Sequence, residues 1–407
     1  MDNLVEAPKI SKRTAYVAIL TMGIISMLGD IVYESGRGIA PDYLMFLGAS
    51  ALVVGIVSGA GEFLGYSARL ISGSLSDKSK AYWLFIFIGY GLILAIPLMG
   101  FTYSLELVIA LLLLERLGKA LRSPSRDTVV SIISKNVGSG KAFGLHEAVD
   151  QIGAIIGPLL FGAVLFFTAN SYPVAFRFLL IPFALMVIAI IYAYRKVGKS
   201  VEVEVKNVKD ERVPLTRGFW TYCIAVLLNT LGLIPVALIL FSGSSILQPL
   251  GQAWMVPLLY VVVQAVDAPM ALVSGHLFDM LGVKLLVLPF ILSVFPVFFV
   301  SFGSLAGVVV ACVMFGFVLG MQESIYRAAV CEFVRLGKRG TAYGVFNTVL
   351  GLGTLASGVI FGFLIDSGYS AIVLVGFALA LQIGAIITLR HSRQIFEQCE
   401  AGMNLKS

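Results

Sequence analysis

The sequence predicts an all-α integral membrane protein whose twelve transmembrane helices form two pseudo-symmetric six-helix bundles. Three observations lead to this fold class. Hydrophobic residues make up 58% of the 407 residues and charged residues only 13%, whereas a soluble chain is about half apolar and a quarter charged. The apolar residues gather into runs long enough to cross a bilayer, and the basic residues fall in alternate connections between the runs. The apolar excess must therefore face lipid.

Each predicted helix is a run of adequate length, because a hydrocarbon core of about 30 Å needs roughly 20 helical residues. The first six runs span residues 15–39, 46–70, 82–101, 105–127, 142–167 and 174–194. The second six span residues 218–241, 252–275, 284–302, 305–329, 341–365 and 370–389. Transmembrane strands would instead alternate apolar and polar residues, which these runs do not do. A closed barrel is excluded.

The chain repeats itself, and a polar segment separates the two copies. Residues 139–145 (SGKAFGL) align with residues 339–345 (RGTAYGV) at an offset of 200. We therefore expect an N-terminal six-helix domain over residues 1–197, a cytoplasmic linker over 198–217 and a C-terminal six-helix domain over 218–407. Six helices return the chain to the side where it began, so the two domains are parallel copies, as in one class of membrane architecture.

The lysines and arginines predict the orientation in the membrane. They lie at the two termini, in the even-numbered connections and in the linker, while the odd-numbered connections contain almost none except Arg177. Short loops rich in basic residues remain in the cytoplasm. We expect a multi-pass protein of the plasma membrane with both termini in the cytoplasm. The formal charge of +6 follows from this distribution and does not indicate nucleic-acid binding.

The connection after the second helix carries the motif Gly73-Ser-Leu-Ser-Asp77-Lys78, and its second-half counterpart retains Gly275 and Asp279. This motif resembles the Gly-x-x-x-Asp-Arg/Lys loop of the major facilitator superfamily, a family of secondary transporters, although the usual continuation with Gly and paired Arg is missing. The resemblance extends over nearly the whole chain. It implies that the loop aspartate locks one conformational state.

The fifth helix carries a second motif of that family, Gly153-x-x-x-Gly157-Pro158-x-x-x-Gly162. It is similar to a pattern of the family's exporters, with Phe161 in place of one glycine. Independently of the resemblance, glycines four apart allow helix backbones to approach closely, and a proline places a bend. Ordinary tight packing and conformational gating explain these glycines equally well.

The resemblance also implies partners and an embedded arginine. The loop aspartate is expected to meet a basic residue, either Arg122 or Arg126. Arg116 resembles the family's membrane-embedded arginine of the Arg-x-x-x-Gly type, which is often linked to proton coupling, although the glycine here is displaced to Gly118.

Charged residues inside the predicted helices are the main evidence for function. Each costs roughly 2.5–3.5 kcal/mol at the bilayer centre, so clusters of them need a reason. Asp30, Glu34 and Arg37 stand at positions i, i+4 and i+7 of the first helix, on one face. The fourth helix carries a comparable stripe that includes Glu115 and Lys119. Such faces must border water or one another. Arg126, Asp127 and Arg327, near the helix ends, read instead as interfacial anchors.

These charges define the predicted site. A carboxyl group in a low dielectric has its pKa raised, which suits it to load and release a proton; the candidates are Asp30, Glu34 and Glu62. Candidates for substrate contact or counter-charge are Arg37, Glu115, Arg116, Lys119, Arg122, Glu147, Asp150, Gln264, Asp267, Gln322 and Glu323. We expect His146 to be a packed or hydrogen-bonded side chain rather than a proton relay. Tyr33 could line a cavity, but a packing or interfacial role is the simpler interpretation.

The predicted function is secondary transport of a small solute by alternating access, with proton-coupled efflux first and proton-coupled uptake of an anionic metabolite as the alternative. A receptor built on a transporter scaffold is a further possibility. HExxH, GxSxG and phosphate-binding loops are absent from the sequence, so neither an enzyme nor a bound cofactor or metal is expected. The expected partners are the substrate, protons and the bilayer, with the chain acting as a monomer.

Overall fold

The computed structural model describes residues 12–134, 138–202, 215–334 and 339–404. Within these ranges the chain is helical and contains no strand. It divides into two compact units, one formed by Met1–Arg37 with Ala68–Val208 and the other by Gly38–Ser67 with Lys209–Ser407. The long helices α1 (Lys12–Phe46) and α2 (Ala51–Ser79) contribute to both units.

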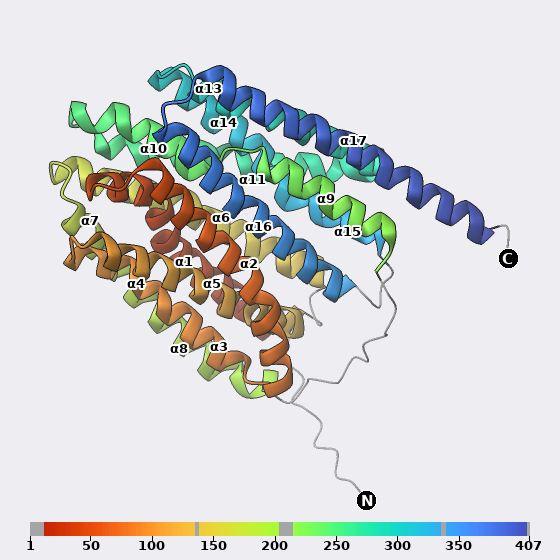
Figure 1. Cartoon of the computed structure of the whole chain (residues 1–407). Helices are drawn as coiled ribbons and strands as arrows, with labels where there is room; N and C mark the ends of the chain where they lie inside the picture. Colours follow the sequence, from red (N-terminus) through yellow and green to blue (C-terminus); the bar gives the residue numbers. More distant parts are fainter. Residues whose placement is uncertain (1–11, 135–137, 203–214, 335–338, 405–407) are drawn as a thin grey trace, which may run out of the picture. The chain divides into compact units, whose positions relative to one another are not determined.

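The first unit contains the remaining helices of the N-terminal half. Its long members are α5 (Leu105–Ser134), α6 (Ser139–Phe167) and α8 (Leu180–Glu202). Shorter helices are α3 (Tyr82–Gly91), α4 (Ala95–Leu98) and α7 (Tyr172–Phe178), and 3-10 turns join α3 to α4 and extend α4. Figure 1 shows these helices running alongside one another.

The second unit contains the helices of the C-terminal half. Its members are α9 (Arg217–Leu231), α10 (Val236–Leu247), α11 (Val256–Leu281), α12 (Val287–Leu292), α13 (Phe295–Val300), α14 (Leu305–Met321), α15 (Arg327–Phe333), α16 (Arg339–Asp366) and α17 (Ala371–Asn404). A π-helical turn, Gln322–Tyr326, joins α14 to α15. Its core includes the stacked rings of Tyr222, Phe333 and Phe346.

Ten stretches of the described residues are long and apolar enough to cross a membrane. One of them, residues 253–300, is 48 residues long and is interrupted at Gly282, whose φ of +57° ends α11; it accounts for two crossings. The 30-residue α5 is not among the ten, because it carries Glu106, Glu115, Arg116, Lys119, Arg122, Arg126 and Asp127. With these two cases the helices account for the twelve predicted crossings.

Several helices extend beyond their predicted ends. α1 continues to Phe46 rather than residue 39, because Pro41 is accommodated inside it. The predicted seventh helix, residues 218–241, is instead two helices, α9 and α10, with Gly232 and Pro235 in the break between them. Hydropathy locates an apolar run, but it does not reveal where the backbone bends within it.

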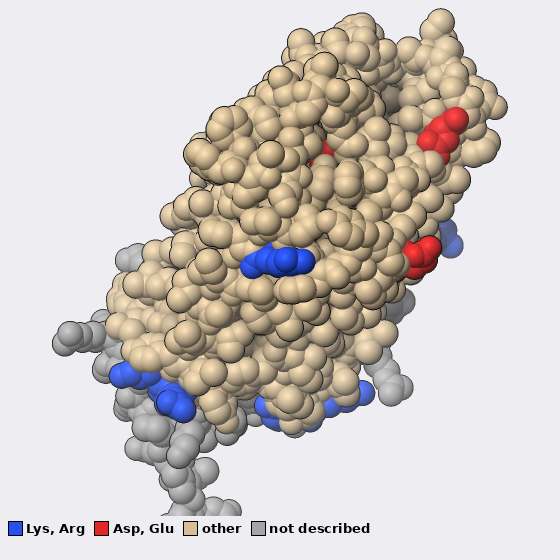
Figure 2. All heavy atoms as spheres, turned by 90° about the vertical axis from the view of Figure 1, so that its left-hand side faces the viewer, with Lys and Arg blue, Asp and Glu red and all other residues tan. Residues whose placement is uncertain are grey.

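The surface exposes many large apolar side chains, as expected for contact with lipid. Large apolar side chains such as Leu272, Ile372 and Ile188 are exposed to 79%, 83% and 64%. Figure 2 shows a face on which acidic and basic side chains are few and uncharged residues predominate. Exposed aliphatic residues on this scale indicate an apolar surrounding.

Candidate functional site

Close helix packing in the first unit positions the candidate site. α6 approaches α1 at Gly153 and Gly157: a side chain at Gly153 would overlap the carbonyl group of Met27, and a Cβ atom at Gly157 would lie 2.6 Å from the carbonyl oxygen of Ile31. The exporter-like glycines of the fifth helix therefore bring α6 against the charged helix α1. Gly162, also in this motif, is buried on α6, and Pro158 lies inside that helix.

α3 and α5 approach each other in the same way. A Cβ atom at Gly118 would lie 2.8 Å from the carbonyl oxygen of Gly89, and one at Gly89 would lie 2.7 Å from the carbonyl oxygen of Gly118. The position of Gly118, displaced from the family pattern, thus has a packing reason. It brings the charged face of α5 close to the residues of α3.

The predicted charges of α1 and α5 meet. The carboxylate of Glu34, only 4% exposed, lies between two cations: its Oε1 atom is 4.0 Å from Lys119 Nζ and its Oε2 atom is 4.0 Å from Arg37 Nη1. The Lys119 and Arg37 side chains are 27% and 20% exposed, whereas that of Glu34 is 6% exposed. Solvent thus reaches the cations more easily than the carboxylate between them.

A second, more deeply buried group lies along α5. Glu115 Oε1 is 3.5 Å from Arg122 Nη1, and Glu115 Oε2 is 3.7 Å from Arg116 Nε. Glu115 and Arg122 are 1% and 3% exposed. One buried carboxylate therefore balances two guanidinium groups, of which that of Arg122 is buried and that of Arg116 is half-buried; buried charges of this kind must retain their partners.

Tyr33 of α1 lies at the centre of these cations. Lys119 Nζ is 3.9 Å from the centroid of the Tyr33 ring, and Cζ of Arg116 and Cζ of Arg122 lie 4.9 and 5.8 Å from it. Arg116 also donates a hydrogen bond to the Tyr33 hydroxyl group. Because an aromatic face attracts cations, Tyr33 lets three like charges gather around one side chain. The interpretation of Tyr33 as a simple packing residue missed this role.

A third cluster joins α1, α3, α5 and α6. Ser26 Oγ lies 2.9 Å from the Tyr90 hydroxyl group, 3.0 Å from His146 Nε2 and 3.2 Å from Arg126 Nη1, which donates to it. Arg126 Nη1 is also 3.8 Å from Asp150 Oδ2. Arg126, expected to be an interfacial anchor, is therefore part of a hydrogen-bonded and charged cluster between four helices.

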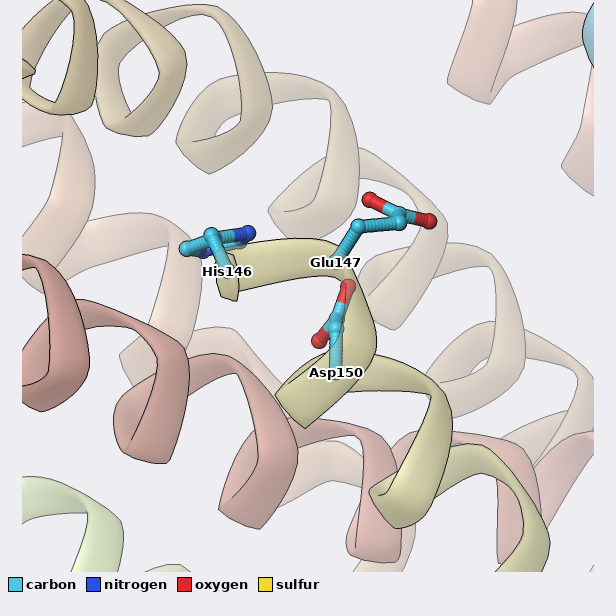
Figure 3. A group of neighbouring side chains, drawn as sticks. All are labelled: His146, Glu147 and Asp150. Carbon is cyan, nitrogen blue, oxygen red and sulfur yellow. The ribbon is translucent and has the colours of Figure 1, made fainter. Parts of the chain in front are cut away.

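His146, Glu147 and Asp150 have ligand atoms within 4.8 Å of one another. Figure 3 shows that Glu147 extends away from the His146 ring, with Asp150 one turn further along α6. His146 Nε2 already bonds to Ser26, and the cation of Arg126 lies beside Asp150. A cationic metal at this place would face Arg126, so the residues fit a hydrogen-bonded cluster better than a metal site.

Asp30 lies on α1 one turn before Glu34, and it is half-buried. It interacts electrostatically with Asp150, Glu34, Lys119 and Arg122. Among the described residues, no ion pair is formed by Asp30, in contrast to Glu34 with its two cations. Two of its charged neighbours are acidic and two are basic, so Asp30 links the Glu34 group to the cluster around Asp150.

The remaining predicted site residues lie elsewhere. Glu62 is half-buried on α2 and belongs to the second unit. Gln264 and Asp267 of α11, in that unit, are 5% and 2% exposed. Gln322 and Glu323 begin the π-helical turn, where Gln322 is half-buried and Glu323 exposed.

The loop motif does not form the expected ion pair in this structure. Asp77 accepts a hydrogen bond of 3.0 Å from the Tyr82 hydroxyl group. Its expected partners are engaged elsewhere, Arg122 with Glu115 and Arg126 with Asp150. The family pattern predicts a basic partner for Asp77. In the structure, Asp77 instead accepts from a neutral hydroxyl group at the start of α3.

The other residues of the loop motif have simpler surroundings. Gly73 faces Pro124, whose Cβ atom would lie 3.5 Å from an added Cβ, and Lys78 is exposed. In the second-half counterpart, an added Cβ at Gly275 would lie 3.1 Å from Ser324 Oγ, and Asp279 is exposed.

These helices and their buried ion pairs define a helical membrane protein of the transporter class. The sequence model of the Major Facilitator Superfamily matches residues 14–358, and the chain belongs to that family. It is 36% identical over 375 residues to an uncharacterized protein of Mycobacterium tuberculosis (strain H37Rv), covering 90% of this chain and 91% of that one. It is 24% identical over 381 residues to an uncharacterized MFS-type transporter of Methanocaldococcus jannaschii, covering 91% and 94%.

Solved structures show the same fold. A mutant of the peptide transporter POT superposes with a TM-score of 0.73 at 14% identity, over 93% of this chain and 95% of that one. A mutant of the nucleoside transporter NupG superposes with a TM-score of 0.71 at 13% identity, over 91% and 99%. The chain is thus a membrane-embedded secondary transporter of a small molecule, rather than an enzyme.

Proposed function

We propose that this transporter is a proton-coupled exporter, and that the carboxylates of α1 carry the proton. The observation that supports the proposal is the arrangement of Glu34 between Lys119 and Arg37 at 4.0 Å each, with Asp30 one turn away. Both cations lie within ion-pair distance of the same carboxylate. A carboxylate in such a place changes its contacts when it gains or loses a proton.

Protonation has a defined consequence here. A proton on Glu34 cancels the charge that faces Lys119 and Arg37, so both cations lose a partner and the two helices α1 and α5 lose an attraction. A proton on Asp30 removes its repulsion from Glu34 and Asp150, which are among its electrostatic neighbours. Glu62, in the second unit, is the third candidate. Substrate and proton would then use the site in turn, which is the logic of antiport.

The direction of transport rests on α6. Its glycines resemble those of the family's exporters and pack directly on α1. A movement of α6 would therefore displace the part of α1 that carries Asp30 and Glu34. Uptake of an anionic metabolite is the second candidate. It is favoured by the gathering of Arg116, Lys119 and Arg122 around Tyr33, where a carboxylate or phosphate would find cationic partners.

The test is flux in proteoliposomes with an imposed pH gradient, using a panel of metabolites and drugs. Asp30→Asn and Glu34→Gln are expected to abolish gradient-driven flux while leaving downhill exchange of substrate, because only the proton step is removed. Glu106→Gln, at an exposed carboxylate on α5, is the matched control. Gradient-driven flux at the original rate in both α1 variants removes the proton-site proposal.

We further propose the plasma membrane as the location, with both termini in the cytoplasm and the chain acting as a monomer. The distribution of basic residues supports this orientation. The sequence repeat supports the proposed domains, residues 1–197 and 218–407 joined by the linker 198–217. Labelling of single cysteines in residues 47–50 and at Lys80 with a membrane-impermeant reagent, in intact cells, tests the orientation: only the former should react.

A further inference from the structure

The N-terminus of α2 is capped by a residue far away in the sequence. Asp366, the last residue of α16, accepts hydrogen bonds from the backbone N–H groups of Ala51 and Leu52, at 2.9 Å to Oδ1 and 2.8 Å to Oδ2. These are the first two N–H groups of α2, which have no partner within the helix. The negative charge also lies at the positive end of the helix dipole. Ser50 Oγ accepts from the third N–H group, that of Val53, at 3.4 Å. The first two N–H groups thus depend on both oxygen atoms of the Asp366 carboxylate.

Below this cap, α2 and α16 are in direct backbone contact. A side chain at Gly55 would overlap the carbonyl group of Gly358, and one at Gly358 would overlap that of Gly55. A Cβ atom at Gly59 would lie 2.6 Å from Cα of Leu355, and one at Gly362 would lie 2.7 Å from the carbonyl oxygen of Ala51. We call these four glycines the glycine seam. Only residues without a side chain allow this approach.

A second contact lies nearby on α1. Gln248, in the turn after α10, donates from Nε2 to both the carbonyl oxygen and Oδ1 of Asp42, at 2.8 Å each. Asp42 is fully buried. Residues 38–67 come from the first six-helix half of the sequence, yet they belong to the unit formed by the second half. The cap, the glycine seam and this contact are among the interactions that join them to it.

We propose that Asp366 is a latch: it positions the first turns of α2 on α16 in the state described here, and it must release α2 for the transporter to open at this end. The inference rests on the proposed function, because an alternating-access cycle requires the two halves to separate there. By the proposed orientation this end faces outward. At the repeat offset of 200, Asp366 corresponds to Phe166, so the first half has no equivalent carboxylate and the latch is one-sided.

The latch is tested by the reactivity of a cysteine placed in it. Ala51 is fully buried, and Ala51→Cys in the full-length chain reports whether the contact is open to a membrane-impermeant maleimide. Removing a helix cap costs about 0.5–2 kcal/mol, so Asp366→Ala should raise the labelling rate about 2- to 30-fold relative to Ala51→Cys alone. Asp366→Asn, which keeps an acceptor but no charge, should give a smaller increase.

Gly55→Ala is the independent perturbation, since its methyl group would overlap Gly358, and it should raise labelling as well. Gly65→Ala on the same helix is its matched control, because nothing lies within 4 Å of a Cβ there. Native Cys223 and Cys312 are 2% and 0% exposed. They must stay unlabelled, which separates opening of the latch from loosening of the fold.

Unchanged labelling of the residue-51 cysteine in Asp366→Ala and Gly55→Ala overturns the proposal. So does an equal rise at Cys223 and Cys312, because the effect would then be general. The assay uses neither substrate nor pH gradient. A latch that responds while Asp30→Asn and Glu34→Gln retain gradient-driven flux would therefore leave the latch in place and remove only the proton-coupling proposal.

Discussion

The buried pair Glu115–Arg122 gives a prediction whose sign and size follow from the structure. Glu115 is the shared partner of Arg122, at 3.5 Å, and Arg116, at 3.7 Å. Glu115→Gln leaves both guanidinium groups without their carboxylate, whereas Arg122→Met leaves Glu115 still beside Arg116. Breaking a buried pair by removing one partner costs about 3–5 kcal/mol. We expect Glu115→Gln to reach that range and Arg122→Met to fall clearly below it.

The double replacement completes the argument. Glu115→Leu combined with Arg122→Met removes both charges and fills the space with apolar atoms, and such replacements are often neutral. The double variant should therefore be more stable than Glu115→Gln. The assay is equilibrium unfolding of the purified protein in mixed micelles, with Glu106→Gln as the exposed control. A loss below about 1 kcal/mol for Glu115→Gln, or equal losses for the two single variants, would refute the reasoning.

Two further predictions concern packing and the second unit. Gly153→Ala should lower the free energy of unfolding by about 1–3 kcal/mol, because the methyl group overlaps the Met27 carbonyl group, while Gly144→Ala, with nothing within 4 Å, should leave it unchanged; thermal unfolding of both variants decides. Asn229 bonds to Ser293, Gln382 and Tyr326 at 3.0, 2.8 and 2.8 Å. Asn229→Leu should cost about 1–3 kcal/mol for each buried group left unpaired, and Ser242→Ala, which loses only a bond within its own helix, should cost far less in the same unfolding measurement.

The sequence predicts the helices well because each one is encoded locally. Apolar runs of bilayer length identify them, and the count of twelve survives even for α5, whose seven charged residues remove it from a simple hydropathy criterion. The spacing of Glu115, Lys119 and Arg122 correctly places them on one face of a helix. The break at Gly232 and Pro235 inside the seventh crossing was missed, because it does not interrupt the apolar run.

The sequence did not allow us to predict which side chains of different helices contact one another. Lys119 lies four residues from Glu115, and helical spacing alone would pair these two residues, yet Lys119 contacts Glu34 on α1 while Glu115 pairs with Arg122 and Arg116. Ser26 and Tyr90, which join the cluster around Arg126, carry no charge and stand in apolar surroundings. The sequence gives one indication for Ser26, which precedes Asp30 by one helical turn on the charged face of α1.

The same limit applies most strongly to the cap of α2. A helix N-terminus is normally satisfied by a residue next to it, so a sequence pattern can find the cap. α2 has such a local cap, because Ser50 Oγ accepts a hydrogen bond of 3.4 Å from the Val53 N–H group. Asp366, which accepts from the first two N–H groups, is separated from Ala51 by 315 residues, and no local pattern at either end announces that contact. A local cap would travel with its own helix through any rearrangement. A cap supplied by another helix stabilises only those states in which the two helices are in contact. Its contribution to the free energy is therefore lost when the helices move apart.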